Sequence, residues 1–246
     1  MVLDRKLKTL LNMKVQENSV AIVGWEEGSA GQIHSWLEKM GIYHIACFVN
    51  PTDKALRIDN RKIRREASQF SYPTKNSFKD KPLLNSSKWA PSLKEYGIKK
   101  VLITTDDLHH RFKQIHYADE NDFELINAVH PTALVMEDAI IKKNVILNAR
   151  AFVGYRAEVF SGSIIDSGSQ IDHHCVIKYC VTIDPGVVMA GNVTIGDFST
   201  VHTGSVIKNR IQIGNNSIIG AGSVIVEDVP NNVTVVGVPG KIIRHH

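Results

Sequence analysis

The chain of 246 residues has 43% hydrophobic and 22% charged residues, and its formal net charge is +4. This composition predicts an ordinary soluble globular protein, long enough for one large domain or two modest ones. The positive charge is mild and is not accompanied by an aromatic-basic motif, so we expect no nucleic-acid partner. No apolar run approaches the ~20 residues that span a bilayer, so we expect no membrane partner.

The three cysteines, Cys47, Cys175 and Cys180, form no CxxC pair. An odd and sparse set argues against a disulfide framework and against a zinc site, and it fits a reducing compartment. The first residues, Met1–Arg5, lack the long apolar core of a signal peptide. We therefore expect a cytoplasmic protein that binds no metal.

Strands and helices alternate in the first 130 residues. An apolar strand at 19–24 precedes a helical pattern at 28–40, which has Ile33, Trp36 and Leu37 on one face. The other expected strands are 42–49, 99–104 and 123–129, and the other expected helices precede Gly97 and cover 108–116. This alternation predicts a small Rossmann-like α/β domain with a doubly wound parallel sheet over residues 1–130.

Residues 52–88 are polar and basic, and we expect a long loop or insertion there. The run Arg61–Arg65 is a solvated face or, alternatively, a site for a phosphorylated ligand. His130-Pro131 marks the end of the first domain, because proline moves the preceding residue out of helical conformation.

The second half, residues 131–246, is a repeat. From Val135 to Ile225 an apolar residue, nearly always aliphatic, recurs every six positions, and a second series of mostly small residues precedes it by two. A period of six fits neither an α-helix nor a long strand. It fits a short strand and a corner, and three such units close a triangular coil. Coils stacked about 4.8 Å apart would make a β-helix of roughly five coils with the aliphatic series inside.

The residue after each aliphatic position is often Gly, Asn or Asp. We expect these residues to take left-handed backbone at the corners. They are Asn148, Gly154, Asp166, Asp172, Asp184, Gly196, Gly214 and Gly220.

The repeat resembles that of the hexapeptide-repeat acyltransferases, and Asp228–Pro230 and Gly237–Lys241 resemble their C-terminal tail. The α/β domain, the His130-Pro131 junction and the segment Ile171–Ile177 together resemble sugar O-acyltransferases and nucleotide-amino-sugar N-acetyltransferases of bacillosamine, perosamine and sialic-acid synthesis. This resemblance implies a left-handed parallel β-helix, an exception to the usual crossover rule. It also implies a homotrimer with acetyl-CoA in the groove between two subunits, and a nucleotide-linked sugar as acceptor.

Acyl transfer from a thioester needs a base, an oxyanion donor and positioning. His173 lies two residues after the inward Ile171, so it projects outside the coil, and the resemblance makes it the general base of a direct transfer. The family has a carboxylate after the base, where this chain has His174. Asp172 could orient the base instead, or be only a corner residue. Asp166 stands where the family often has Asn near the acceptor sugar, and could equally be a corner residue.

Gly191 follows His173 by one coil, so we expect it to stack on His173 and to leave room for a ligand. By resemblance, its backbone N–H contacts the thioester carbonyl. By resemblance, Thr203 and Ala221 stand where the family contacts the pantetheine arm. Lys241 either approaches the CoA phosphates or is an exposed lysine without a binding role. His202 stands at a corner where small residues are usual, and we interpret it as structural.

The glycine-rich loop 24–31 joins the first strand to the first helix, where backbone N–H groups could meet a phosphate. Two glutamates in this loop would repel a phosphate. Ser29 replaces the family's histidine, and Asn50 stands where an acidic residue is expected. Gly24, Gly28, Ser29 and Asn50 therefore form either a nucleotide-sugar site of altered mode or a packing turn.

Three classes of function remain open. The first is acetyl-CoA-dependent N-acetylation of a nucleotide-linked amino sugar, with sugar O-acetylation close behind. The second is a zinc carbonic anhydrase, which needs three converging histidines, whereas the coils offer one adjacent pair, His173-His174. The third is a non-catalytic, sugar-binding trimer, which the departures at Ser29, Asn50 and His174 keep open.

Overall fold

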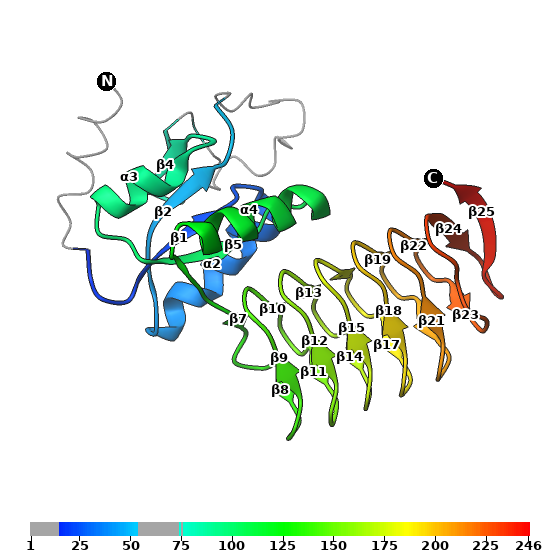
Figure 1. The fold of residues 1–246 in the computed structure, drawn as a ribbon. Coiled ribbons are helices and arrows are strands. Elements are labelled where there is room, and N and C mark those ends of the chain that lie inside the picture. The colour runs from blue at the N-terminus through cyan, green and yellow to red at the C-terminus, as the bar shows by residue number, and fades with distance from the viewer. Residues whose placement is uncertain (1–14, 54–73, 75) are drawn as a thin grey trace, which may run out of the picture. The chain divides into compact units, whose positions relative to one another are not determined.

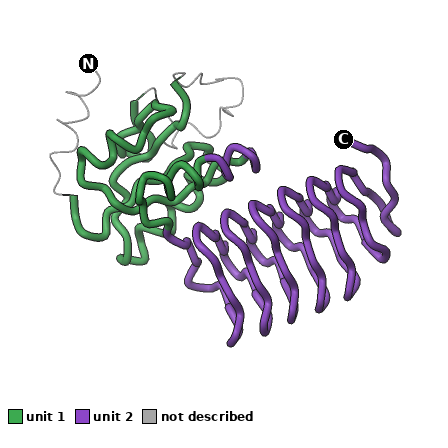
Figure 2. Tube along the Cα trace, in the orientation of Figure 1, with its two compact units in different colours: residues 1–106, 114–125 green, residues 107–113, 126–246 purple. Residues whose placement is uncertain are grey.

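The computed structural model describes residues 15–53, 74 and 76–246. The segment Met1–Arg5 and the basic run Arg61–Arg65 lie outside these described residues. The chain divides into two compact units, one of residues 1–106 and 114–125, the other of residues 107–113 and 126–246 (Figure 2). Among the described helices, none combines the length and the apolar character that crossing a membrane requires.

The first unit contains a six-stranded sheet in the order β3-β4-β2-β1-β5-β6 (Figure 1). All its neighbouring strands are parallel except β3 and β4. Its strands are β1 (Ser19–Val23), β2 (His44–Asn50), β3 (Ser77–Phe78), β4 (Lys81–Asn85), β5 (Lys100–Ile103) and β6 (Glu124–Leu125). Its helical segments are η1 (Glu27–Gly31), α2 (Gln32–Leu37), η2 (Glu38–Met40), α3 (Trp89–Glu95) and α4 (Leu108–Glu120), whose first residues belong to the second unit.

Two sequence predictions for this half were wrong. Part of the expected loop at 52–88 is the hairpin β3–β4, and β4 extends the sheet by pairing with β2. Its apolar signal is only Leu83-Leu84 inside a basic stretch, which is too short for periodicity to detect. The expected strand at 123–129 is two strands, because β7 (Ala128–Val129) leaves the first sheet and pairs with β10 of the repeat.

The repeat forms a parallel β-helix with three faces of mostly two-residue strands (Figure 1). The first face holds β7, β10 (Ile146–Leu147), β13 (Ile164–Ile165), β16 (Thr182–Ile183), β19 (Thr200–Val201), β22 (Ile218–Ile219), β24 (Val233–Val236) and the antiparallel β25 (Lys241–His245). The second face holds β8 (Leu134–Val135), β11 (Phe152–Val153), β14 (Gln170–Ile171), β17 (Val188–Met189), β20 (Val206–Ile207) and β23 (Val224–Ile225). The third face holds β9 (Ile140–Ile141), β12 (Glu158–Val159), β15 (Val176–Ile177), β18 (Thr194–Ile195) and β21 (Gln212–Ile213).

The interior confirms the two predicted series. From Leu147 onward every member of the aliphatic series is buried, and so is every small residue that precedes it by two, from Val145 onward. Most buried serines of the second series donate to backbone of the same coil. Ser163 Oγ donates to Lys178 O at 2.7 Å, and Ser199 Oγ donates to Gly214 O at 2.7 Å. A small polar side chain can therefore be buried here without an unpaired donor.

The prediction of left-handed corners at the residue after the aliphatic one was wrong. The left-handed residue stands three positions after it, and none of the eight residues that we expected is in that conformation. Even His174 (φ 57°) and Phe198 (φ 56°) adopt it. Their N–H groups donate to the preceding coil, at 2.9 Å to Tyr155 O and 3.0 Å to Tyr179 O. The hydrogen bonds between stacked coils hold the backbone in the left-handed conformation. Bulky residues therefore adopt it despite its strain.

The glycines of the wrongly assigned series have a steric role instead. A Cβ on Gly154 would lie 2.7 Å from both Asp172 C and His173 N. A Cβ on Gly196 would lie 2.6 Å from Asn215 N. These glycines let consecutive coils approach closely at a corner.

All three cysteines are free and buried. Burial raises the pKa of the Cys47 thiol to about 12 and those of Cys175 and Cys180 to about 11. Because the thiolate is the reactive form, we expect a disulfide reagent at pH 8 to modify none of them in the folded protein and all three in denaturant. Rapid modification of a native thiol, measured by absorbance, would contradict this burial.

Candidate active site

His173 and His174 lie at the corner between β14 and β15, where the second face turns into the third. Both side chains are exposed, as their phase in the repeat predicts, whereas Ile171 before them and Cys175 after them are buried. The coil therefore holds two imidazoles outside its core on a rigid backbone.

Hydrogen bonds to three consecutive coils fix this corner. The N–H of His173 donates to Asp172 Oδ1 at 2.7 Å, and the N–H of His174 donates to Tyr155 O of the preceding coil at 2.9 Å. The carbonyl of His173 accepts from Asn192 N of the following coil at 2.9 Å. Asp172 thus supports the backbone of His173, and its alternative interpretation as a left-handed corner residue fails.

The two imidazoles contact each other directly. Nδ1 of His173 and Nδ1 of His174 are 3.0 Å apart, with ring centroids 5.2 Å apart and planes at 83°. The Tyr155 ring packs edge-on against His174 at 5.8 Å. The orienting partner of His173 in this structure is therefore a second imidazole, at the position where a carboxylate was expected by resemblance.

Gly191 stacks on His173, as the spacing predicts, but the space at its Cα is filled by the His173 ring. A Cβ there would overlap the imidazole, with Nδ1 at 2.8 Å and two other ring atoms closer still. The missing side chain makes room for the His173 ring, where we expected room for a ligand. Contact between its N–H and a thioester remains a prediction.

A second polar column, which sequence reasoning missed, follows the corner between the first and second faces. Asn148 Nδ2 donates to Asp166 Oδ1 at 3.0 Å, and in later coils Asp184 Oδ2 lies 2.7 Å from His202 Nδ1. The His202 side chain is 44% exposed. A carboxylate-oriented imidazole is a competent base, so His202 is a rival to His173. Its signal in the sequence was the one-coil spacing between Asp184 and His202.

The residues expected to bind CoA lie on different corners of one chain. Thr203 and Ala221 are exposed at the His202 corner, one coil apart, and Lys241 is exposed on β25. Gly191 lies at the His173 corner. Within one chain the structure therefore does not bring these residues together.

The residues of the expected nucleotide site are mostly engaged in packing. Gly24 donates its N–H to Val49 O at 2.8 Å, and a Cβ on it would overlap the Thr104 side chain. Asn50 is 3% exposed, and its Nδ2 donates to Asn85 Oδ1 at 2.8 Å.

The remaining residues of that loop differ in exposure and in their hydrogen bonds. Gly28 is exposed, with open space where a Cβ would stand. Ser29 Oγ is buried without a hydrogen-bond partner among the described residues. In the same loop, Glu26 Oε2 accepts from Trp25 N at 3.0 Å, so it occupies a donor that a phosphate would use.

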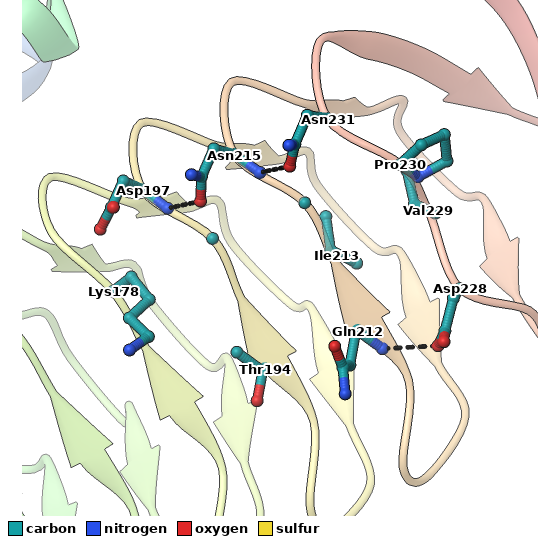
Figure 3. A pocket seen from close by; sticks show the side chains of 12 residues that line it. Lys178, Thr194, Asp197, Gln212, Ile213, Asn215, Asp228, Val229, Pro230 and Asn231 are labelled. Carbon is teal, nitrogen blue, oxygen red and sulfur yellow. Dashed lines mark hydrogen bonds between the residues drawn. The ribbon is translucent and has the colours of Figure 1, made fainter.

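One hollow of the structure is lined by residues away from His173. A groove of about 720 Å³ runs along the third face toward its corner with the first (Figure 3). A ladder lines it, in which Asn215 Oδ1 accepts from Asp197 N at 2.9 Å and Asn231 Oδ1 accepts from Asn215 N at 2.7 Å. A smaller hollow of about 520 Å³ lies near Arg150, Ser167 and Gly186. Among the described residues, no three His, Cys, Asp or Glu side chains are placed to hold a metal ion.

Known proteins resemble this chain both in its repeat and in its whole fold. Residues 192–227 match the family described as bacterial transferase hexapeptide (six repeats). A curated relative, acyl-[acyl-carrier-protein]–UDP-N-acetylglucosamine O-acyltransferase of Campylobacter lari, is 29% identical over 95 residues. That match covers 31% of this chain and 36% of the relative, so the chain spans about a third of its length.

Two solved structures match nearly the whole chain. The first is PerB from Caulobacter crescentus, in complex with CoA and GDP-perosamine, with a TM-score of 0.78 and 24% identity over 93% of this chain and 99% of that one. The second is the acetyltransferase domain of PglB from Neisseria gonorrhoeae, in complex with acetyl coenzyme A, with a TM-score of 0.77 and 25% identity over 93% and 100%. The predicted β-helix is thereby confirmed, and the match over residues 192–227 agrees with the resemblance to hexapeptide-repeat transferases.

Proposed function

We propose that this protein transfers an acetyl group from acetyl-CoA directly to the amine of a nucleotide-linked amino sugar, with His173 as the general base. The observation that carries the proposal is an exposed imidazole held against Gly191 and oriented through its Nδ1 at 3.0 Å. The similar solved structures contain CoA with GDP-perosamine, or acetyl-CoA, and this supports the donor and the class of acceptor.

In this mechanism the free Nε2 of His173 takes a proton from the acceptor amine as its nitrogen attacks the thioester carbon. The C–N bond forms, the C–S bond breaks, and the CoA thiolate leaves and is protonated. The Gly191 N–H faces the developing oxyanion. No covalent acyl-enzyme is needed.

The placement of the expected CoA contacts supports an assembly of several copies of the chain, and we propose the homotrimer that the resemblance implies. Gly191 belongs to the His173 corner, and Thr203 and Ala221 belong to the His202 corner. If one pantetheine arm touches all three residues, two neighbouring chains supply the two corners. The active site is then complete only in the assembly.

In this proposal the first unit is a Rossmann-like domain that holds the nucleotide. Ligands of open parallel sheets bind outside the carboxyl ends of the strands, where the loop after β1 carries the exposed Gly28. Because Gly24 and Asn50 are committed to packing and Ser29 Oγ is buried, we assign the direct contact to the exposed backbone at Gly28.

We expect acetyl-CoA to raise the unfolding temperature, because a ligand at 100 times its Kd stabilises by about 2.7 kcal/mol. We also expect a mass-spectrometric screen of nucleotide-linked amino sugars with acetyl-CoA to show a gain of one acetyl group. Matched sugars with a hydroxyl in place of the amine separate N- from O-transfer. Acetyl-CoA binding without any transfer would favour a sugar-binding trimer, and stoichiometric zinc in the purified protein would favour a hydratase.

A further inference from the structure

We infer that His174 is the positioning residue of the reaction, and that it acts as a neutral hydrogen-bond acceptor for the Nδ1–H of His173. This inference rests on the proposed function for the choice between the two tautomers and for its kinetic consequences, and on the geometry of the two rings for the contact itself. The two Nδ1 atoms are 3.0 Å apart, and a hydrogen bond between them needs one hydrogen, supplied by one ring and accepted by the other.

The location of that hydrogen decides whether His173 can work as a base. If His173 donates from Nδ1, its Nε2 is bare and can take a proton from the acceptor. If His174 donates, His173 accepts at Nδ1 and a neutral His173 carries its hydrogen on Nε2, where it cannot serve as a base. Only the first arrangement is productive, and the tautomer of a base histidine is set by the partner of its other nitrogen.

The backbone and the adjacent coils hold His174 in place for this role. Its left-handed conformation (φ 57°) and its N–H bond to Tyr155 O direct the side chain from the corner, and the Tyr155 ring packs against it at 5.8 Å. Gly191 confines the His173 ring on the other side. The imidazoles therefore meet at Nδ1 between two rigid coils.

The contacts of the charged groups around the pair are with other atoms, so they leave His174 as the partner of His173 Nδ1. The carboxylate of Asp172 accepts from the backbone N–H of His173 at 2.7 Å. Arg156, from the preceding coil, lies over the Tyr155 ring at 5.0 Å and 3.6 Å from Asp138. Facing from the following coil are Gly191 and Asn192, which carry no titratable side chain. The partner of His173 Nδ1 is then a neutral imidazole, and after proton transfer the His173 imidazolium still donates to it.

Two substitutions at the same backbone position test this assignment with opposite hydrogen-bonding chemistry. His174→Glu supplies an acceptor-only carboxylate, and His174→Lys supplies an ammonium that can only donate. We expect His174→Glu to keep kcat within about tenfold. We expect His174→Lys to lower kcat about 100-fold at every pH, with an unchanged KM for acetyl-CoA, the upper range for a lost orienting partner.

The pH profile separates orientation from charge. The carboxylate introduced by His174→Glu would stabilise the protonated form of the neighbouring base, so the acid limb of kcat/KM should move to higher pH while the plateau persists. If charge were the only effect, His174→Lys would move the acid limb of kcat/KM to lower pH and leave the plateau value of kcat/KM intact. An intact plateau in His174→Lys would overturn the proposal.

A spectroscopic measurement reads the tautomer without any turnover. Long-range proton–nitrogen spectra of the full chain with ¹⁵N-labelled histidine, assigned with His173→Ala, should show hydrogen on Nδ1 of His173 and none on Nε2 at neutral pH. Hydrogen on Nε2 would contradict the assignment of His174 as acceptor. If the wild type acetylates no amino sugar, the proposed function fails, yet this spectrum still decides the role of His174.

Discussion

His173→Ala should lower kcat about 10²–10⁴-fold, the range for loss of a positioned general base, which corresponds to roughly 3–5 kcal/mol of transition-state stabilisation. The side chain is exposed, and its removal takes no atom from the aliphatic core. The unfolding temperature and the oligomeric state should therefore stay those of the wild type. The measurement is steady-state acetyl transfer to the amino sugar found in the screen, with both substrates varied.

His202→Ala is the matched control for this experiment. His202 is also a partly exposed corner imidazole, with Asp184 at 2.7 Å, but it stands on the other corner. If His173 is the base, kcat of His202→Ala should stay within about tenfold of the wild type. The reverse result would be a kcat lowered about 10²–10⁴-fold in His202→Ala and a normal kcat in His173→Ala. It would assign the role of base to the Asp184–His202 pair.

The repeat was predictable because its physics is local in the sequence. Every six residues, a small residue is followed two positions later by an aliphatic one. From Val145 onward the residues at these two positions are buried. The outward phase of His173 followed from the same count. The left-handed corner position was misassigned in every repeat, because Gly, Asn and Asp have two uses. They tolerate left-handed backbone, but Gly154 and Gly196 are required by the closeness of the next coil.

Other features depend on contacts that a periodic frame does not encode. The rotamers that bring His173 and His174 together at Nδ1 are not visible in a dipeptide. The pairing of β4 with β2 depends on Phe48 facing Leu83, across a segment with no apolar period. Arg111 lies in a helix, as expected, but the sequence does not indicate that its Nη1 donates to Gly162 O at 3.0 Å and to Thr182 Oγ1 at 3.2 Å. Such long-range pairs follow from three-dimensional packing.

Gly154→Ala should destabilise the β-helix by about 3 kcal/mol, the upper end for overpacking. The added Cβ would stand 2.7 Å from Asp172 C and His173 N and 3.0 Å from Ile171 O. All of these are backbone atoms, whose positions are fixed by the stacked hydrogen bonds of two coils. The coils must separate below His173, so stability and activity should fall together. Urea unfolding and kcat measured on the same preparation check this.

Gly191→Ala adds the same methyl group on the opposite side of His173, and there its three nearest atoms all belong to the imidazole. A side chain can rotate away, so we expect less than half the loss of stability seen in Gly154→Ala. The displaced ring should still lower kcat about 100-fold, because a shift of about 1 Å in a catalytic group costs that much. Gly168→Ala, at a left-handed corner with open space around it, measures the backbone strain alone. Equal losses of stability in Gly154→Ala and Gly191→Ala would mean that the imidazole is held as firmly as the coil. Normal kcat in Gly191→Ala would mean that the reacting position of His173 is not the one seen against Gly191.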